Sequence, residues 1–440
     1  MEHTVYKEGS FLCSCEKMHA NPIKEIVIGA GALEKLKTAP SELHLGRKAM
    51  LITDAFVYDL MGKEIEDYLR QACCQVKALA YPLPMVPDEE HLFDFLECYE
   101  PDVDFFVAAG TGAVNDITRY FSGKFAKPYI SVPTAPSMDG YSAKVSLLFV
   151  KGVKQTLDAV APMAIYADTN YLKGVPSRLL AAGIGDLAAK ITACADWKIS
   201  SLVNGEYYCQ HTIDDLMKIV DKCLAMPSAL TNRDQDTVQH LTDGLMFSGV
   251  AMHWVGSSRP AAGAEHHITH FWGMQSGNPQ HLHGIEVAVG TLIMLDTYRK
   301  VLELDFQKVD ADAWAAQMPD KEAWEAQVRE IYGDQAGVAF KQQKDKTFDK
   351  AQIAQRIRNI QANEEPIKEI IRQTLKQGEH LEQAMKELGA PTTYRELGIS
   401  DEMFRTSHFW AKEIRPKYTV LDLAYDLGAL EEIGEALSQK

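Results

Sequence analysis

Short, continuously apolar runs alternate with stretches of helical periodicity over the first 170 residues of the chain. The runs cover residues 26–28, 49–53, 105–109, 129–132 and 163–167, and residues 76–79, which include Lys77, are interpreted as a further strand. A strand that is apolar along its whole length is buried on both faces. Because helices separate the runs, the pattern predicts a parallel sheet that is covered by helices on both sides. A hairpin over 145–150 and 153–157, joined by Lys151-Gly152, is expected to lie outside this sheet.

After about residue 174 the apolar runs become scarce and a period near 3.6 residues takes over. The expected helices cover residues 179–203, 212–224, 238–255, 287–304, 350–388 and 420–437. The polar segment 305–350 is interpreted as surface helices and not as a core element. We therefore predict an α/β domain over residues 1–174, followed by an all-helical domain over 175–440, with ligand bound in the cleft between them.

Composition narrows the class of protein. The 440 residues are 46% hydrophobic and 24% charged, which is typical of a globular protein with a sizeable core. The net charge of −16 argues against nucleic acid or an anionic membrane as a partner. No apolar stretch is long enough to span a membrane, and the N-terminus lacks the features of a signal peptide.

The eight cysteines are too sparse for a disulfide scaffold, and a reduced, cytoplasmic chain is the simplest interpretation. All of them lie within the first 223 residues. Cys13-Ser14-Cys15 lacks zinc-finger spacing, and the sequence shows no matching pair of Cys or His nearby. The two cysteines therefore do not form a zinc-finger motif.

A glycine turn follows the run at 105–109 and opens a helix. It comprises Gly110, Thr111, Gly112, Ala113, Val114, Asn115 and Asp116. Such a turn lets backbone N–H groups approach a phosphate, but it is equally consistent with a tight strand-to-helix connection. Asp54 ends the run at 49–53 and could accept hydrogen bonds from an adenosine ribose, which favours NAD over NADP. The alternative role of Asp54 is to cap the next helix.

Five histidines lie within eighteen residues, at positions 266, 267, 270, 281 and 283. His266 and His270 share one helix face, and His283 precedes a long apolar helix. Upstream, the segment that ends in Gly185-Asp186 is expected to start a helix, with Asp186 in its first turn. Two imidazoles and a carboxylate form a three-ligand metal set that leaves a position open for substrate. The alternative is a group of structural histidines, but their clustering favours a metal.

Other motifs exclude some enzyme classes and suggest a phosphate site. The chain has no His-Glu-x-x-His, Gly-x-Ser-x-Gly or P-loop motif, which disfavours zincin proteases, α/β-hydrolases and P-loop nucleotide hydrolases. Arg259, Lys190, Lys144 and Arg178 could each provide positive charge for a substrate phosphate, although such side chains are more often structural. Arg259 and Lys190 are favoured because they flank the metal candidates.

Taken together, these motifs resemble a known superfamily, which contains dehydroquinate synthases, glycerol dehydrogenases and iron-type alcohol dehydrogenases. Within it, the bacterial sn-glycerol-1-phosphate dehydrogenases are most similar. The similar stretches, in chain order, are residues 110–116, 133–140, 183–190, 258–266 with His270, 281–284, and, near the C-terminus, 418–423. The resemblance covers roughly residues 23–300, and it implies a dehydroquinate synthase-like α/β domain followed by a helical domain.

The resemblance also implies roles for individual residues. Asp186, His266 and His283 are the implied metal ligands, and the family motif places the ligand at His266 and not at the competing His267. Asp139 and His270 are implied at the catalytic centre, where they contact substrate together with Asp186, and Arg259 and Lys190 are our candidates for its phosphate. The implied cofactor contacts are Asp54, Gly110, Thr111, Gly112, Ala113, Val114, Asp116, Thr134, Ala135, Pro136, Ser137 and Ala143. At Ala143 the family usually has Ser, and after His283-Gly284 it has Glu-Gln where this chain has Ile285-Glu286.

The implied reaction is the reversible, metal-dependent reduction of dihydroxyacetone phosphate to sn-glycerol 1-phosphate. The implied cofactors are NAD, with NADP as the alternative, and one divalent metal, with Zn²⁺ ahead of Ni²⁺ and Fe²⁺. A glycerol or other polyol dehydrogenase of the same fold, and a non-catalytic nucleotide-binding relative, remain the rival functions. The loop at 133–139 does not resemble that of dehydroquinate synthases. We further expect a cytoplasmic homodimer, a small phosphate substrate and a role in phospholipid biosynthesis.

Overall fold

The computed structural model describes residues 3–150, 153–225, 227–276 and 281–439, which form two compact units. The first unit comprises Met1–Leu187 and Met226–Ser257, and the second comprises Ala188–Ala225 and Ser258–Lys440. One helix, α7 (Ser177–Asn204), continues from the first unit into the second. A domain is a part of the chain that could fold alone, whereas these units are defined by compactness. The domain boundary expected between residues 174 and 175 therefore stays a prediction.

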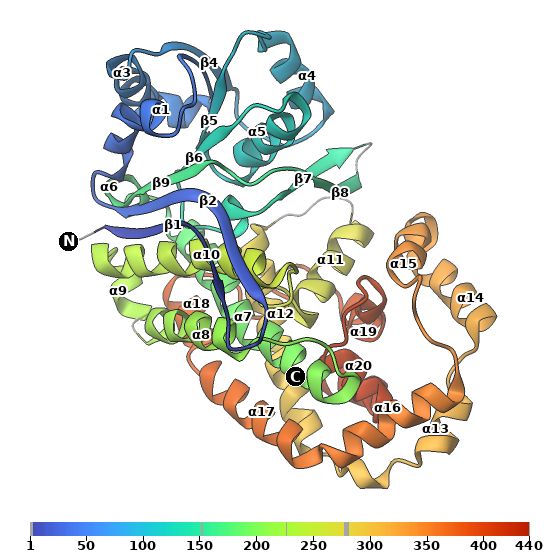
Figure 1. Ribbon diagram of the computed structural model, residues 1–440. Coiled ribbons are helices and arrows are strands. Elements are labelled where there is room, and N and C mark those ends of the chain that lie inside the picture. Colours follow the sequence, from blue (N-terminus) through green and yellow to red (C-terminus); the bar gives the residue numbers. More distant parts are fainter. Residues whose placement is uncertain (1–2, 151–152, 226, 277–280, 440) are drawn as a thin grey trace. The chain divides into compact units, whose positions relative to one another are not determined.

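A seven-stranded sheet forms the centre of the first unit (Figure 1). Its spatial order is β1-β2-β9-β6-β5-β3-β4, and every neighbouring pair is parallel except β1 with β2. The strands are β1 (Thr4–Leu12), β2 (Met18–Gly29), β3 (Lys48–Asp54), β4 (Gln75–Tyr81), β5 (Phe105–Gly110), β6 (Tyr129–Pro133) and β9 (Ala164–Asp168). The predicted parallel sheet is therefore confirmed. Strand β1 was not predicted, because most of its side chains are exposed and it carries no buried-type run.

Helices cover both faces of this sheet, as the continuously apolar strands required. On one face, η1 (Ala32–Lys37), α1 (Ala39–Glu42) and α3 (Lys63–Gln71) enclose a core that includes Leu51, Val107 and Ile65. On the other, α4 (Glu89–Cys98) and α5 (Gly112–Phe125) enclose a core that includes Ile52 and Phe106. Successive residues of one strand, such as Leu51 and Ile52 of β3, therefore belong to the cores on opposite faces of the sheet.

The remaining elements of the first unit connect and extend this layer. They are α2 (Ala55–Val57), η2 (Tyr58–Gly62), η3 (Gly140–Ser142), α6 (Thr169–Leu172), α9 (Pro227–Thr231) and α10 (Gln235–Val255). The expected hairpin is confirmed as a separate antiparallel pair, β7 (Val145–Val150) and β8 (Val153–Asp158). Its predicted link, Lys151-Gly152, lies outside the described residues.

The second unit is helical throughout its described residues. After the end of α7 its helices are α8 (Gln210–Leu224), α11 (Ala264–Ser276), α12 (His283–Glu303), α13 (Ala311–Gln317), α14 (Lys321–Tyr332), α15 (Ala336–Gln342), α16 (Lys350–Ala362), α17 (Glu364–Gln377), α18 (Leu381–Glu387), α19 (Asp401–Trp410), α20 (Val420–Asp426) and α21 (Leu430–Ser438), with turns at η4 (Phe306–Lys308), η5 (Gly333–Gln335) and η6 (Ala411–Glu413). The single pattern expected over 350–388 divides into three helices, with breaks at Asn363 and at Gly378.

The polar segment 305–350 forms helices as predicted, but the expectation that it lies outside the core is wrong. Ala315 of α13 and Met318, the residue after that helix, are buried in one cluster with Ile353 and Ile357 of α16. Trp324 of α14 is buried as well. A few apolar residues at helical spacing are enough to build this small core, and the many charged residues around them conceal it in the sequence.

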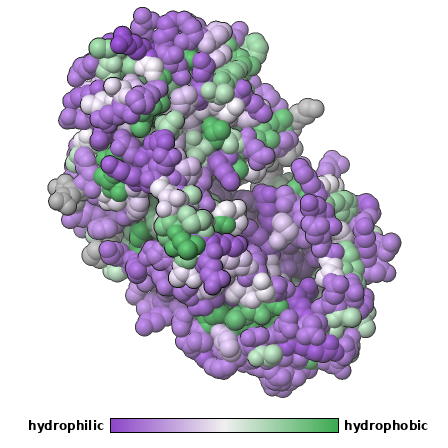
Figure 2. Space-filling view, in the orientation of Figure 1, coloured by the Kyte–Doolittle hydropathy of each residue, from purple (hydrophilic) through white to green (hydrophobic). Residues whose placement is uncertain are grey.

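Among the described residues, no helix has the length and apolar character needed to cross a membrane. Hydrophilic residues cover most of the face in Figure 2, with hydrophobic residues in scattered groups between them. Such scattered groups are ordinary for a globular protein.

Candidate active site

Three segments that were predicted to bind the cofactor meet at one edge of the sheet in the first unit. Asp54 ends β3, Gly110 ends β5 and Pro133 ends β6. These strands are parallel neighbours, with β5 between the other two. The helices that follow β3 and β5 pack on opposite faces of the sheet. In open α/β sheets, the crevice at such a change of side is where nucleotides bind.

The glycine turn between β5 and α5 has the geometry of an anion site. Thr111 is the N-cap of the 14-residue helix α5, with extended backbone and no side-chain cap. A Cβ atom on Gly110 would lie only 2.6 Å from Cγ2 of Val114, so the turn excludes larger residues. The Asn115 amide donates to the Thr111 carbonyl at 3.2 Å and accepts from Ser131 at 2.6 Å. These contacts hold the positive end of α5 at the edge of the sheet.

Asp54 caps a helix, which was one of the two roles considered for it. Its Oδ1 accepts from the Val57 backbone N–H at 2.9 Å at the start of α2. The carboxylate is nearly buried at the end of β3. The capping role does not displace the predicted contact with a ribose, because a carboxylate has two oxygens. That contact stays a prediction.

Asp116, another predicted cofactor residue, forms a buried ion pair with Arg119 at 3.0 Å. The Arg119 guanidinium also donates to the carbonyls of Val145, at 2.8 Å, and Tyr141, at 3.2 Å. Arg119 therefore ties α5 to the segment that follows the loop at 134–139. No motif in the sequence indicated this arginine, because the backbone carbonyls that it contacts lie more than twenty residues away. A cofactor contact by Asp116 stays a prediction.

The loop after β6 carries the remaining predicted cofactor residues, which are Thr134, Ala135, Pro136, Ser137 and Ala143. The Ala135 carbonyl accepts from the Tyr141 hydroxyl at 2.8 Å, and the Thr134 N–H donates to Gly110 at 3.3 Å. Pro136 lies so close to Gly183 of α7 that a Cβ atom there would fall inside the 3.0 Å limit for real contacts. Ala143 is half-buried at the end of η3. The loop is thus fixed at several points beside the glycine turn.

Asp139 and Asp186 are adjacent in the first unit. The Asp139 N–H donates to Oδ2 of the buried Asp186 at 2.8 Å, and Ser248 donates to Oδ2 of Asp139 at 2.8 Å. The prediction that Asp186 lies in the first turn of a helix is wrong. Helix α7 begins at Ser177, so Asp186 lies deep inside it. Gly183 and Gly185 suggested a helix start, but at Gly183 it is the close approach of Pro136 that requires glycine.

Three of the five clustered histidines come together within the second unit. His266 and His270 lie on α11, and His283 is the first residue of α12. Their ring centroids are 5.3 Å apart for His266 and His283, and 6.0 Å apart for each of the other two pairs. The predicted shared face of His266 and His270 is therefore confirmed, and the packing of α11 on α12 adds His283.

Glu265 fixes the orientation of His266. Its Oε1 lies 2.9 Å from Nδ1 of His266, and its Oε2 accepts from Thr192 at 2.7 Å. Burial alone would raise the pKa of Glu265, but the hydrogen bond and the charge of His266 outweigh it, and the pKa is lowered. With Nδ1 engaged by a carboxylate, Nε2 of His266 is the nitrogen suited to ligate a metal. The sequence placed Glu265 in the motif without assigning it this role.

A second buried acid fixes the start of α11. Asp196 accepts from the backbone N–H groups of Ala264, at 2.9 Å, and Val420, at 2.7 Å. Burial and the charge of Glu265 raise the pKa of Asp196 to about 7. Asp196 thus joins the start of α11 to the start of α20, a link that no local motif in the sequence indicates.

His267, the competing ligand candidate, is not part of the histidine group. It is buried, and neither of its ring nitrogens has a hydrogen-bond partner among the described residues. Burial and the nearby charges of Lys417, Arg415 and Arg259 hold its pKa well below the ordinary value. Its surroundings are therefore cationic, which disfavours a bound metal cation.

The two cations favoured for the substrate phosphate are both buried and engaged within the second unit. Arg259 pairs with Glu206 and donates to the Tyr418 carbonyl at 2.9 Å. The Lys190 ammonium donates to the Ala261 carbonyl at 3.2 Å. These contacts give both residues a structural role. Their contact with a phosphate stays a prediction.

Comparisons with known proteins agree with the family resemblance that these motifs indicated. Residues 27–176 match the family model described as iron-containing alcohol dehydrogenase. A glycerol-1-phosphate dehydrogenase [NAD(P)+] from Bacillus licheniformis is 29% identical over 95% of this chain and 93% of its own length. One from Geobacillus thermodenitrificans is 34% identical over 63% of this chain and 70% of its own length.

Solved structures share the fold at low identity. Glycerol dehydrogenase from Schizosaccharomyces pombe aligns over 94% of this chain and 90% of its own, with a TM-score of 0.58 and 16% identity. Sulfoacetaldehyde reductase from Bifidobacterium kashiwanohense, in complex with NAD+, aligns over 96% and 98%, with a TM-score of 0.59 and 15% identity. At these identities the likeness establishes the architecture alone, and it agrees with the predicted dehydroquinate synthase-like fold.

Proposed function

Because the chain belongs to the glycerol-1-phosphate dehydrogenase family, we propose that it is an oxidoreductase that interconverts dihydroxyacetone phosphate and sn-glycerol 1-phosphate with NAD(H) or NADP(H). The observation that carries this proposal is the match to the Bacillus licheniformis relative, which extends over 95% of the chain and includes both units. The glycine turn and the neighbouring strand ends support the nucleotide part of the reaction.

Asp186, His266 and His283 are the proposed ligands of a divalent metal ion. They offer one carboxylate oxygen and two imidazole nitrogens, a donor set that suits Zn²⁺ best and also suits Ni²⁺ or Fe²⁺. The brace from Glu265 to Nδ1 of His266 is the usual support for a ligating histidine. When bound, such an ion would act as a Lewis acid toward the ketone and alkoxide oxygens of the substrate.

The chain's own residues would bind the cofactor, orient the substrate and deliver a proton to it. The N-terminus of α5 and the glycine turn would hold the cofactor pyrophosphate, Asp54 would bind the adenosine ribose, and residues 134–137 would lie on the nicotinamide side. When bound, the cofactor would supply a hydride to the carbonyl carbon of the substrate, and the carbonyl oxygen would then need a proton. His270, whose ring lies beside those of His266 and His283, is the proposed route for that proton. Asp139, held by Ser248, is proposed to contact the substrate hydroxyl groups.

The deciding experiment is NADH oxidation by the purified chain in the presence of dihydroxyacetone phosphate, with stereochemical assignment of the product. We expect metal-dependent turnover and sn-glycerol 1-phosphate. The sn-glycerol 3-phosphate enantiomer, or no turnover with either NADH or NADPH after metal reconstitution, would refute the proposal.

Two rival functions are separated by the same assay. A polyol dehydrogenase of this fold would oxidise glycerol at least as well as glycerol 1-phosphate, whereas we expect a strong preference for the phosphate ester. A non-catalytic relative would bind NADH without turnover. The support of His266 by Glu265, which is itself held by Thr192, argues against that relative, because such a buried charged brace is typical of a ligating histidine.

A charge change at Asp54 should alter the choice of cofactor. We expect Asp54→Ser to lower the KM for NADPH relative to that for NADH by about tenfold, because it removes the carboxylate that would repel a 2′-phosphate. Serine can still cap α2 through its hydroxyl, so stability should change little. Steady-state kinetics with both cofactors measure the effect. An unchanged ratio of the two KM values would remove Asp54 from the ribose site.

Glu265→Gln should weaken metal binding without removing a ligand. Glutamine keeps the shape of the side chain but no longer supports the imidazole with a charge, so we expect metal affinity to fall about 10- to 100-fold. Competition with a chelator measures the affinity, and excess metal should restore turnover. Activity that stays low at saturating metal would show that Glu265 acts in another way.

The physiological setting follows from the same proposal. We propose a cytoplasmic homodimer that supplies a glycerophosphate backbone for phospholipid biosynthesis. The small phosphate substrate and the net charge of −16 support the absence of nucleic acid and membrane partners.

A further inference from the structure

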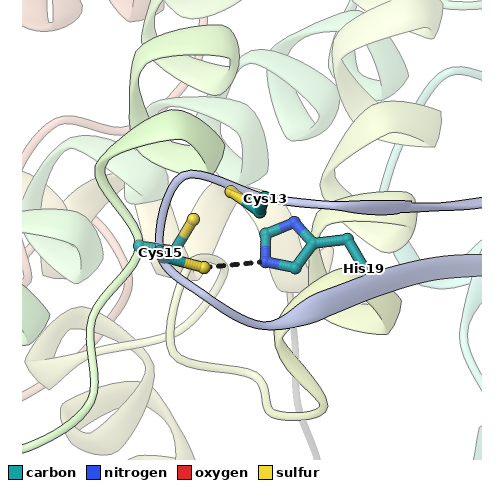
Figure 3. A group of neighbouring side chains, drawn as sticks. Cys13, Cys15 and His19 are labelled. Carbon is teal, nitrogen blue, oxygen red and sulfur yellow. Dashed lines mark hydrogen bonds between the residues drawn. The ribbon is translucent and has the colours of Figure 1, made fainter.

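The turn between β1 and β2 brings together three side chains that the sequence analysis set aside. Cys13 follows the last residue of β1, Cys15 lies in the turn, and His19 is the second residue of β2. The two sulfurs and a ring nitrogen all lie within 4.8 Å of one another. Figure 3 shows the two thiols and the imidazole gathered at this turn. Sequence spacing did not indicate this group, because its third donor is a single histidine and not a matching Cys or His pair.

We propose that Cys13, Cys15 and His19 ligate a thiophilic metal ion, Zn²⁺ by its chemistry, at a site separate from the proposed catalytic ligands. Thiolate and imidazole are the donors of structural zinc sites. In a tetrahedral zinc site the S···N edge is about 3.5 Å, from bonds of about 2.3 and 2.0 Å. Here Sγ of Cys15 and Nε2 of His19 are 3.3 Å apart. A fourth donor, from water or a further side chain, completes the shell.

The backbone of the turn fixes the two thiols. The Cys13 N–H donates to the Lys17 carbonyl at 3.0 Å, and the Glu16 N–H donates to the Cys13 carbonyl at 2.9 Å. Glu16 adopts a φ of 65°, in the left-handed region that residues with a Cβ atom rarely occupy. The turn thus holds an uncommon conformation, and that conformation places Cys13 and Cys15 on the same side as His19.

Aromatic contacts fix the imidazole. The His19 ring stacks on Trp254 of α10, with centroids 5.6 Å apart, and meets the edge of Phe11 at 5.3 Å. His19 pairs with Phe11 across the hairpin. The ring is fully buried, so its plane is held before any ion binds. A pre-oriented ligand loses little freedom on binding, which favours affinity.

Burial and charge also fit a metal ion. Cys13 and His19 are buried and Cys15 is half-buried, which leaves an entry path on one side. Two thiolates neutralise a divalent cation, so the occupied site carries no net charge from these ligands, as a buried site requires. None of the chain's eight cysteines, all within the described residues, is in a disulfide. The ion would fix the end of the hairpin, and the stacking of His19 on Trp254 would connect the site to α10.

Cobalt substitution tests this site independently of catalysis. Reduced protein would be titrated with Co²⁺, and the thiolate-to-cobalt charge-transfer band would be recorded in the near ultraviolet. The proposed catalytic ligands contain no sulfur, so they cannot produce this band. We expect about one thiolate-bound cobalt per chain, displaced by one equivalent of Zn²⁺.

Matched variants assign the band. We expect it to disappear in Cys13→Ser/Cys15→Ser and to persist in Cys73→Ser, which changes an exposed cysteine elsewhere on the same unit. No band in the reduced wild-type protein, or an undiminished band in the double variant, would overturn the proposal. If the double variant does not fold, X-ray absorption of the zinc-loaded wild-type protein decides the question, and a shell without sulfur overturns the site. Loss of dehydrogenase activity bears only on the proposed function.

Discussion

Replacing His266 with alanine should abolish turnover while leaving the fold and NADH binding intact. The Lewis-acid role of the metal accounts for several kcal/mol of transition-state stabilisation. We therefore expect kcat/KM for dihydroxyacetone phosphate to fall by at least about 1000-fold, equivalent to about 4 kcal/mol. Metal content by mass spectrometry should fall in parallel, and chelation of the wild-type protein should have the same effect. Circular dichroism checks that the variant is folded.

The matched control is His281→Ala, which changes a half-exposed histidine close by in the sequence but outside the predicted ligand set. It should keep wild-type metal content and nearly wild-type activity. NADH fluorescence should report the same dissociation constant in both variants, because the predicted cofactor residues lie in the first unit. A His266→Ala protein that contains no metal yet turns over at the wild-type rate would exclude metal-dependent catalysis.

Most of the sheet strands that the sequence predicted are buried along nearly their whole length. The run at 105–109 is buried at every position, so apolar continuity alone identified β5 and its parallel neighbours. Strand β1 lacks that signal, because it lies at the edge of the sheet and its side chains are mostly exposed. Its place in the fold depends on pairing with β2, which a local pattern does not report.

The wrong predictions concern residues whose conformation or burial depends on contacts with residues far away in the sequence. Gly183 is unfavourable inside a helix, so the sequence favoured a helix start there. Helix α7 nevertheless continues through it, and the close approach of Pro136 is what requires glycine at that position. The burial of Met318 depends in the same way on α16, more than thirty residues later. Helical spacing predicted the shared face of His266 and His270, whereas the Ser248 contact with Asp139 crosses more than a hundred residues.

The cysteine turn shows a different limit. Cys13 and Cys15 lack zinc-finger spacing, and the third donor, His19, lies across a turn whose form depends on the left-handed backbone at Glu16. The spacing of residues in the sequence predicts ligand sets that lie on regular helices or strands. It does not predict a set that an irregular turn brings together, and here the register of the hairpin determines which side chains meet.

The second large effect is expected at Gly183, where alanine should destabilise the protein and displace the loop beside the cofactor. A Cβ atom there would meet the Pro136 carbonyl oxygen inside 3.0 Å, and that oxygen belongs to the backbone, so the loop itself must move. Overpacking of this kind costs about 1–3 kcal/mol. Because residues 134–137 are predicted to lie beside the nicotinamide, we expect the KM for NADH to rise about tenfold or more, by the cost of about 1.4 kcal/mol per decade.

The control for this variant is the same substitution at Gly337 of α15, where a new Cβ atom would meet nothing within 4 Å. Alanine favours a helix over glycine by about 0.5–1 kcal/mol, so Gly337→Ala should raise the free energy of unfolding slightly. The two substitutions should therefore have opposite signs in chemical denaturation. A Gly183→Ala protein as stable as wild type, with an unchanged KM for NADH, would show that the loop at 134–137 can move at no cost and does not position the cofactor.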